Sequence, residues 1–169
     1  MKQILTSAMV LIAVMSGAAQ QSAEPDQHMI DMRVQQIVEY AIEQGSTVTP
    51  DGVKVRAMRV DVTLQEEREI KNYGERAIQP LTKFLDSPEY AGQLLAVRLL
   101  NVIGGKLTIT PLSYAAEKCS AASARFSAIL GLSHQPWDQV AELFKRVAAN
   151  DTDPQVKRAA QLEIEKHKS

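Results

Sequence analysis

Disulfide chemistry and a strong net charge are the first things that the sequence lacks. Cys119 is the only cysteine among the 169 residues, so no disulfide can form within the chain and packing must hold the fold together. The 19 basic and 20 acidic side chains leave a formal net charge of −1. A nearly neutral chain offers no reason to expect nucleic acid or an anionic membrane surface as the partner.

Long apolar runs are also absent, except at the N-terminus. Lys2 stands before an apolar stretch from Ile4 to Met15, and small residues lead from there to Ala19. One positive charge, a short apolar core and a small-residue exit are typical of a secretory signal, and we predict cleavage after Ala19. The alternative is a retained anchor, but this core is shorter than the roughly 20 apolar residues of a membrane span. We therefore expect an exported protein, in the periplasm or outside the cell, with no stable membrane span after cleavage.

The mature chain is long enough for one folded domain. Removal of residues 1–19 leaves residues 20–169 and a formal charge of −2, because Lys2 is the only charge lost. A chain of this length can bury a sizeable core. We expect residues 20–26 to form a flexible lead, and residues 27–72 and 73–169 to fold together as a single compact unit.

Residues that could carry chemistry are few and scattered. His28, His134 and His167 show no metal-ligand spacing to one another. His28 and Asp31 lie one helical turn apart, but two ligands on an exposed face make a weak site. Cys119 could be a nucleophile, yet it continues an apolar stripe, which favours a buried core position. We predict no metal, no cofactor and no catalytic residue; a hydrolase-type enzyme whose site is assembled only by the fold is the alternative.

The clearest structural signal is a helical hairpin formed by residues 75–85 and 89–103. In both segments apolar residues recur at a spacing of 3.6, and the short connection between them makes the helices antiparallel. We expect Asp86 or Ser87 to cap the second helix, with Pro88 in its first turn and a stop at the double glycine that follows. The residues expected to face inward are Ala77, Ile78, Leu81, Phe84 and Leu85, and then Leu95, Ala96, Leu99, Leu100, Val102 and Ile103.

Two segments resemble a HEAT repeat, of the short kind that recurs in bacterial proteins. They are Tyr73–Pro88 (YGERAIQPLTKFLDSP) and Leu94–Gly104 (LLAVRLLNVIG). The resemblance extends over about residues 73–167. It implies a mainly all-α fold, a right-handed α-α superhelix of about three stacked helical hairpins. HEAT motifs are degenerate, so this similarity indicates a fold and says little about function.

One feature of that family is an aspartate in the turn with a basic residue six positions later. Asp151 and Lys157 keep the pairing. Asp86 does not, because Gly92 stands six positions after it. The resemblance is therefore uneven along the chain.

Two further units follow the hairpin. Thr110 is expected to cap a helix with Pro111 in its first position, and a companion helix should cover residues 121–132. Pro80 corresponds to Pro111 at a period of 31, and Leu100 corresponds to Leu130 at a period of 30. The third unit should start near Pro136 and end in a helix after the turn at residues 150–154. The residues of 121–132 expected to face inward are Ala122, Phe126, Ile129 and Leu130.

The segment before the hairpin mixes helix and extended chain. We expect a helix over residues 27–44, closed by Gly45, and a second over 64–72, capped by Thr63 and Glu66. Between them, at about residues 48–62, valine alternates with charge after a Thr-Pro-Asp-Gly turn signal. That pattern predicts a strand or extended arm that pairs with Val48 or lies on the helices, and a β-branched helix is the alternative. Leu64 and Ile70 should be the main apolar residues of the second helix.

The function favoured by this pattern is binding. In HEAT-like stacks the second helix of each pair usually lines the concave side, so the resemblance points to the polar edges of these helices. A mixture of charge and amide favours a protein or peptide partner. A structural protein that associates with its own copies is a further alternative. The candidate binding residues are Arg98, Asn101, Arg158 and Gln161.

Overall fold

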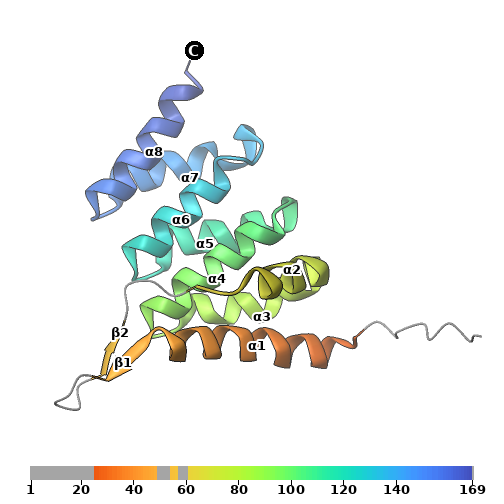
Figure 1. The fold of residues 1–169 in the computed structure, drawn as a ribbon. Coiled ribbons are helices and arrows are strands. Elements are labelled where there is room, and N and C mark those ends of the chain that lie inside the picture. The colour runs from red at the N-terminus through yellow and green to blue at the C-terminus, as the bar shows by residue number, and fades with distance from the viewer. Residues whose placement is uncertain (1–24, 49–53, 57–60, 169) are drawn as a thin grey trace, which may run out of the picture.

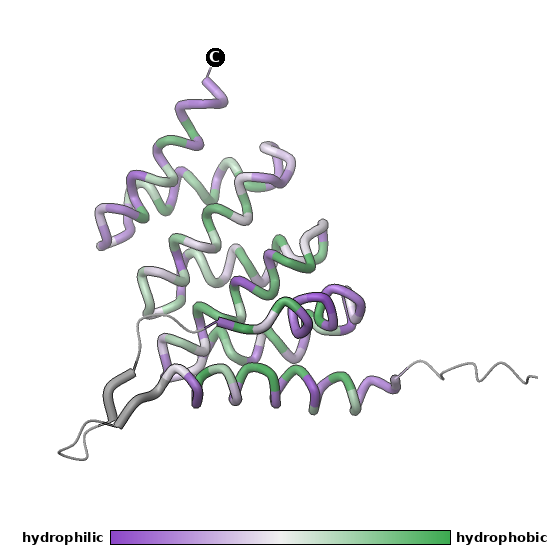
Figure 2. Tube along the Cα trace, viewed as in Figure 1, coloured by the Kyte–Doolittle hydropathy of each residue, from purple (hydrophilic) through white to green (hydrophobic). Residues whose placement is uncertain are grey.

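A computed structural model describes residues 25–48, 54–56 and 61–168. The predicted signal and most of the lead lie outside these residues. Within them the fold is mainly α-helical, as predicted, and the helices pack around one core (Figure 1). Figure 2 shows the apolar residues gathered where helices meet, with polar residues at the ends and outer faces.

Helix α1 (Gln27–Gln44) has the predicted bounds. Asp26 caps it by accepting a hydrogen bond from the Met29 N–H at 2.8 Å, and the Gly45 N–H bonds back to the Ala41 carbonyl. Five apolar residues on one side of α1 are buried, so the helix covers the end of the stack with one face. These residues are Ile30, Val34, Ile37, Val38 and Ala41.

Two short strands follow, β1 (Ser46–Val48) and β2 (Lys54–Arg56). They pair antiparallel, with Val48 opposite Lys54. The turn signal and the later half of the predicted arm fall on residues 49–53 and 57–60, outside the described part of the chain. Helix α2 (Leu64–Tyr73) then begins with the predicted capping box between Thr63 and Glu66.

The two main apolar residues of α2 differ in burial. Ile70 is fully buried, but Leu64 is largely exposed. Leu64 is the first residue of the helix, where the chain is still emerging from an extended segment. The helix therefore packs through little more than one apolar residue, and its position depends on polar contacts as well.

The helix predicted over residues 75–85 is divided. A 3₁₀ turn η1 (Gly74–Ala77), a short helix α3 (Ile78–Thr82) and a second 3₁₀ turn η2 (Lys83–Asp86) take its place. Pro80 explains the division, because proline has no N–H for the carbonyl four residues before it. That carbonyl, on Arg76, instead accepts a bond of 2.9 Å from the Gln27 side chain.

Helix α4 (Tyr90–Ile103) starts later than predicted. Pro88 lies before the helix and not in its first turn. The Ser87 hydroxyl accepts a hydrogen bond from the Glu89 N–H, which keeps residues 87–89 in a turn. The predicted stop is confirmed: Gly104 and Gly105 have φ angles of +65° and +80°, which favour glycine.

Helix α5 (Ile109–Lys118) also starts differently. Thr110 is inside the helix, not its cap, because a 3₁₀ turn η3 (Lys106–Thr108) precedes it. The Thr108 hydroxyl closes that turn on the Gly105 carbonyl at 2.8 Å. The remaining helices are α6 (Ala122–Leu132), α7 (Trp137–Asn150) and α8 (Pro154–Lys166), and Asp153 caps the last.

Helices α4, α6 and α8 pack side by side in one layer, while α5 packs on α7 in a second layer (Figure 1). The closest pairs are α5 with α6 and α7 with α8. Helices α1, α2 and α3 all contact α4. The layer of α4, α6 and α8, here called the second-helix layer, runs through the length of the molecule.

The helices of this layer recur at a period of 32. They begin at Tyr90, Ala122 and Pro154, so the spacing between successive starts is constant. The predicted period of 30 paired Leu100 with Leu130, but Leu130 is 47% exposed and Leu132 is fully buried. The inward face predicted for residues 121–132 is therefore wrong at Leu130. The residues of α6 that are buried are Ala124, Ala128, Ile129 and Leu132.

Candidate interaction surface

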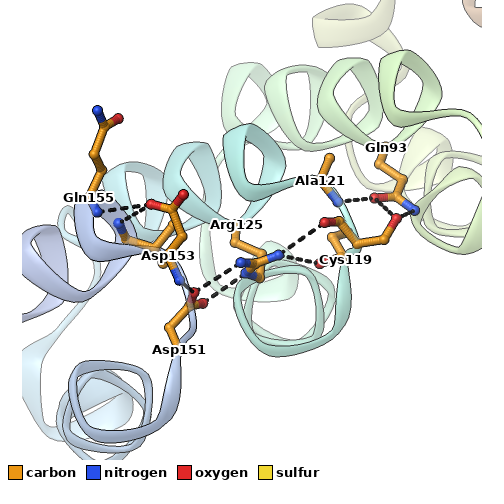
Figure 3. Close-up of polar contacts among 9 residues, drawn as sticks. Gln93, Cys119, Ala121, Arg125, Asp151, Asp153 and Gln155 are labelled. Atoms are coloured by element: carbon orange, nitrogen blue, oxygen red, sulfur yellow. Dashed lines mark hydrogen bonds and ion pairs between the residues drawn. The ribbon is translucent and has the colours of Figure 1, made fainter.

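A ladder of polar side chains joins the turns that precede α4, α6 and α8 (Figure 3). Arg125, on α6, holds the Asp151 carboxylate with two bonds of 2.7 and 2.9 Å. One of its terminal nitrogens also donates to the Cys119 and Ser120 carbonyls at 2.9 and 3.1 Å. Both side chains of the ion pair are nearly buried, 11% and 5% exposed. Arg125 thus ties the turn before α6 to the turn before α8.

Gln93 makes the same connection one unit earlier. At the period of 32 it corresponds to Arg125, and its amide nitrogen donates to the Ser87 carbonyl at 2.8 Å and the Ser120 hydroxyl at 2.9 Å. Its oxygen accepts the Ala121 N–H at 2.9 Å. A side chain in the fourth position of a second helix therefore bonds to its own turn and to the next one.

The ladder shows that the turn residues of successive units align differently from the sequence-based comparison of Asp86 with Asp151. With a period of 32, Asp151 corresponds to Cys119 and Ser87, so the comparison of Asp86 with Gly92 is one position out of register. The direct partner of Asp151 is Arg125 of the preceding unit. Lys157, six positions on, adds only a weaker electrostatic contribution.

The electrostatics of Asp151 suit a structural role. Burial acts to raise its pKa, but the hydrogen bonds from Arg125 and from the Asp153 N–H outweigh it and leave the pKa below its ordinary value. The carboxylate stays charged and bound at neutral pH. The charged pair therefore holds the two turns together.

The other candidates for chemistry lie apart. Cys119 is buried, as predicted, and burial raises the pKa of its thiol to about 11, so it stays protonated. Asp31, the proposed neighbour of His28, accepts a bond from Gln27 and lies 3.9 Å from Lys83. Among the described residues no three His, Cys, Asp or Glu side chains are grouped as a metal site would need.

Arg98 and Asn101, of the predicted binding residues, make short polar contacts within the chain. Arg98 pairs with Asp61 at 2.7 Å. Asn101 lies against α6, where its amide nitrogen donates to the Ser127 carbonyl at 3.0 Å. Its oxygen is buried without a hydrogen-bond partner in the described structure, directly over Gly131. A Cβ on Gly131 would lie only 1.8 Å from that oxygen, so glycine makes room for the amide.

Arg158 and Gln161 lie one turn apart on the exposed side of α8. Arg158 forms a loose pair with Glu165 at 3.4 Å, and both side chains are more than half exposed. Gln161 occupies the position held by Val97 in α4 and Ile129 in α6, both fully buried. The polar residue therefore appears where α8 faces solvent, as on the outer side of a terminal repeat.

Sequence reasoning missed two exposed leucines. Leu130 and Leu162 are 47% and 41% exposed, and both stand at the position of Arg98, one and two units later. We call Arg98, Leu130 and Leu162 the outer row. A pocket of about 520 Å³ adjoins Leu130 at the ends of α4 and α6, and Asn101 and His134 help to line it. The alignment of Arg98 at a period of 32 would have located both leucines.

Comparisons of the chain with protein-family models, with curated proteins and with solved structures gave no match. In the described part of the chain, no helix has the length and apolar character to cross a membrane.

Proposed function

We propose that this chain is an exported binding or scaffold protein that takes up a protein partner on the outer row and its surroundings. The observation that carries the proposal is the exposure of Leu130 and Leu162 on adjacent helices. Apolar side chains that gather on one face of a folded chain, with polar groups at their edge, are typical of protein interaction sites.

The proposed architecture is a short HEAT-like stack with a right-handed superhelical turn. The constant spacing of the second helices supports it, as does the side-by-side packing of α4, α6 and α8. Ala96, Ala128 and Ala160, all fully buried, recur at the same spacing and let neighbouring helices approach closely. In such stacks the second helices line the binding side, which is where the outer row lies.

Binding is favoured over catalysis by the state of the reactive groups. The buried thiol of Cys119 stays protonated, and the Asp151 carboxylate is bound by Arg125. By contrast, the leucines of the outer row are accompanied on α8 by the exposed guanidinium of Arg158 and the exposed amide of Gln161. That combination of apolar area with a few polar groups fits a protein surface better than it fits a small polar substrate.

Retention of partners by immobilised protein tests the proposal. The purified protein is incubated with an envelope fraction of its own host, beside the variant Leu130→Asp/Leu162→Asp. A matched control, Met29→Asp/Met32→Asp, makes the same change at two methionines of α1 that are 54% and 53% exposed. We expect a partner that wild type and control retain and the leucine variant loses. Equal retention by all three proteins would show that the outer row is not the binding site.

Export is tested separately. The full chain is expressed in the host, and the mass of the purified protein is measured. We propose a mature protein that begins at Gln20 and is recovered outside the cytoplasm. An intact N-terminus on protein recovered from the cytoplasm would contradict this part of the proposal.

A further inference from the structure

One peptide segment already lies on the second-helix layer, and it belongs to the chain itself. Asp61 pairs with Arg98, and Val62 is partly buried against the core. The segment then enters α2 through the Thr63 cap, and Figure 1 shows it running across α4. A carboxylate next to a branched apolar side chain therefore occupies the α4 end of the outer row.

This segment is fastened in place by α2. Arg33 of α1 holds Glu69 of α2 with bonds of 2.8 and 2.9 Å, and the Tyr73 hydroxyl donates to the same carboxylate at 2.6 Å. Burial raises the pKa of Tyr73 to about 12, so this hydroxyl remains a donor over the physiological range. The α4 end of the outer row is thus partly covered, with the Arg98 side chain 37% exposed, and its open part lies over α6 and α8.

The open part offers apolar surface and a guanidinium in a different arrangement, because leucines stand at the position of Arg98. Leu130 and Leu162 supply apolar surface, and Arg158 supplies a guanidinium one helical turn from Leu162. The present partner of Arg158 is Glu165, in a pair too exposed and too long to be strong. An incoming carboxylate could displace Glu165 at little cost.

The spacing of the helices sets the form of the occupant. Packed helices lie about 8–10 Å apart, and an extended chain advances about 3.3 Å per residue. Apolar side chains two residues apart on an extended segment point to the same face and lie about 6.6 Å apart, so they would reach Leu130 and Leu162 together. An extended segment, like the one that carries Asp61, matches this distance better than a single compact ligand.

We propose that the open outer row binds an extended segment of a partner protein in which a carboxylate stands beside apolar side chains, the chemistry of Asp61 and Val62. Arg158 pairs with the carboxylate, while Leu130 and Leu162 cover the apolar side chains. The pocket next to Leu130 receives the residue that follows along the segment. This inference rests on the proposed function and specifies its partner.

The probe is the peptide Ac-VDVTL-NH2, which copies residues 60–64, and its binding is followed by two-dimensional NMR of the ¹⁵N-labelled protein. We expect saturable shifts at Leu130, Arg158 and Leu162. The matched peptide Ac-VNVTL-NH2, which lacks the carboxylate, should bind about fivefold more weakly, the effect of losing one partly exposed ion pair.

Variants sharpen the test. Arg158→Glu should weaken binding of the aspartate peptide about fivefold or more, while Glu165→Gln should strengthen it about twofold by releasing Arg158. Both positions are exposed, so the unfolding midpoints should stay close to that of wild type. If Arg158→Glu does not fold, Leu162→Ser serves in its place and should also weaken binding.

Three results would overturn the inference. The first is equal binding of the two peptides, and the second is a set of shifts confined to Arg98 or to α1. The third is a shift of Leu130 and Leu162 that follows protein concentration without peptide, which would make a second copy the occupant. If the peptide fails while envelope retention still depends on the two leucines, the binding function stands and only the chemistry of the partner is wrong.

Discussion

The second-helix layer has two sides that follow different rules. On the inner side, Ala96, Ala128 and Ala160 repeat without change at a spacing of 32 and are fully buried. On the outer side, the equivalent residues of the outer row are an arginine and two leucines, all partly exposed. The inner side repeats because each helix must fit the next, and close packing tolerates little change in volume. The outer side is partly exposed, so close packing does not hold its residues to one volume.

The largest expected contrast is between a buried and an exposed leucine. Leu99→Asp places an unpaired charge in the core and should lower the free energy of unfolding by about 4 kcal/mol or more. Leu130→Asp, on the exposed side, should cost less than about 1 kcal/mol. Urea unfolding of both variants measures the difference. Similar losses would mean that the two sides of the layer are not distinct.

The ladder provides the second contrast, between ion pairs of equal length and unequal burial. Arg125→Ala leaves the Asp151 carboxylate buried and unpaired, which should cost about 3 kcal/mol or more. Arg146→Ala breaks a pair with Glu117 that is also 2.7 Å long but 55% and 30% exposed, so it should cost less than about 1 kcal/mol. Thermal melts of the two variants give the comparison, and equal shifts would count against a stabilising ladder.

Acid should weaken the ladder in a defined range. The pKa of Asp151 is lowered in the folded protein, so the pair stabilises the fold above the unfolded pKa of about 3.9. That stability is lost as the pH falls from there through the folded pKa. Urea titrations of wild type and Asp151→Asn should therefore differ most near neutral pH and converge below about pH 4. A difference that stays constant down to pH 3 would contradict the role of the carboxylate charge.

The contact between α4 and α6 is tested by a substitution whose effect on stability should be smaller and should change sign with the background. Gly131→Ala should destabilise by about 1–3 kcal/mol, because the new Cβ would overlap the Asn101 amide. In an Asn101→Ala background the same change should stabilise by up to about 1 kcal/mol, since alanine is the better helix former. Calorimetry of the four proteins in this cycle gives the coupling. Equal effects in both backgrounds would show that the glycine does not serve the amide.

The smallest expected effect is at the covered end of the outer row. Arg98→Ala removes a partly exposed ion pair with Asp61 and should cost less than about 1 kcal/mol of unfolding free energy. Urea unfolding measures this loss of free energy. Arg98→Lys, which keeps the positive charge, is the matched control. A loss as large as that of Arg125→Ala would make the Asp61 segment part of the core and not a cover over the outer row.

Much of the helical framework was predictable from sequence. The bounds of α1, the capping box of α2 and the double-glycine stop after α4 were all predicted, because each depends on residues within one or two turns. The division of residues 75–85 was missed, although Pro80 was visible. Its effect depends on Gln27, which lies 49 positions from Arg76 in the chain and binds the carbonyl that proline leaves free.

The exposure of Leu130 was not predicted, because the face of α6 was misjudged. That helix is rich in alanine and apolar around much of its circumference, so periodicity alone does not define one inward side. The fully buried Leu132 marks the true phase, and Leu130 then faces outward.

Sequence by itself determined the helical class of the chain and most of its helix ends, since local spacing, caps and glycine stops govern these properties. Tertiary structure alone decided that Arg125 binds Asp151, that Asn101 rests on Gly131 and that Asp61 covers Arg98. The hydrogen bonds that fix these arrangements join residues at least 26 positions apart. Their formation depends on how whole helices stack, and no local pattern records that arrangement.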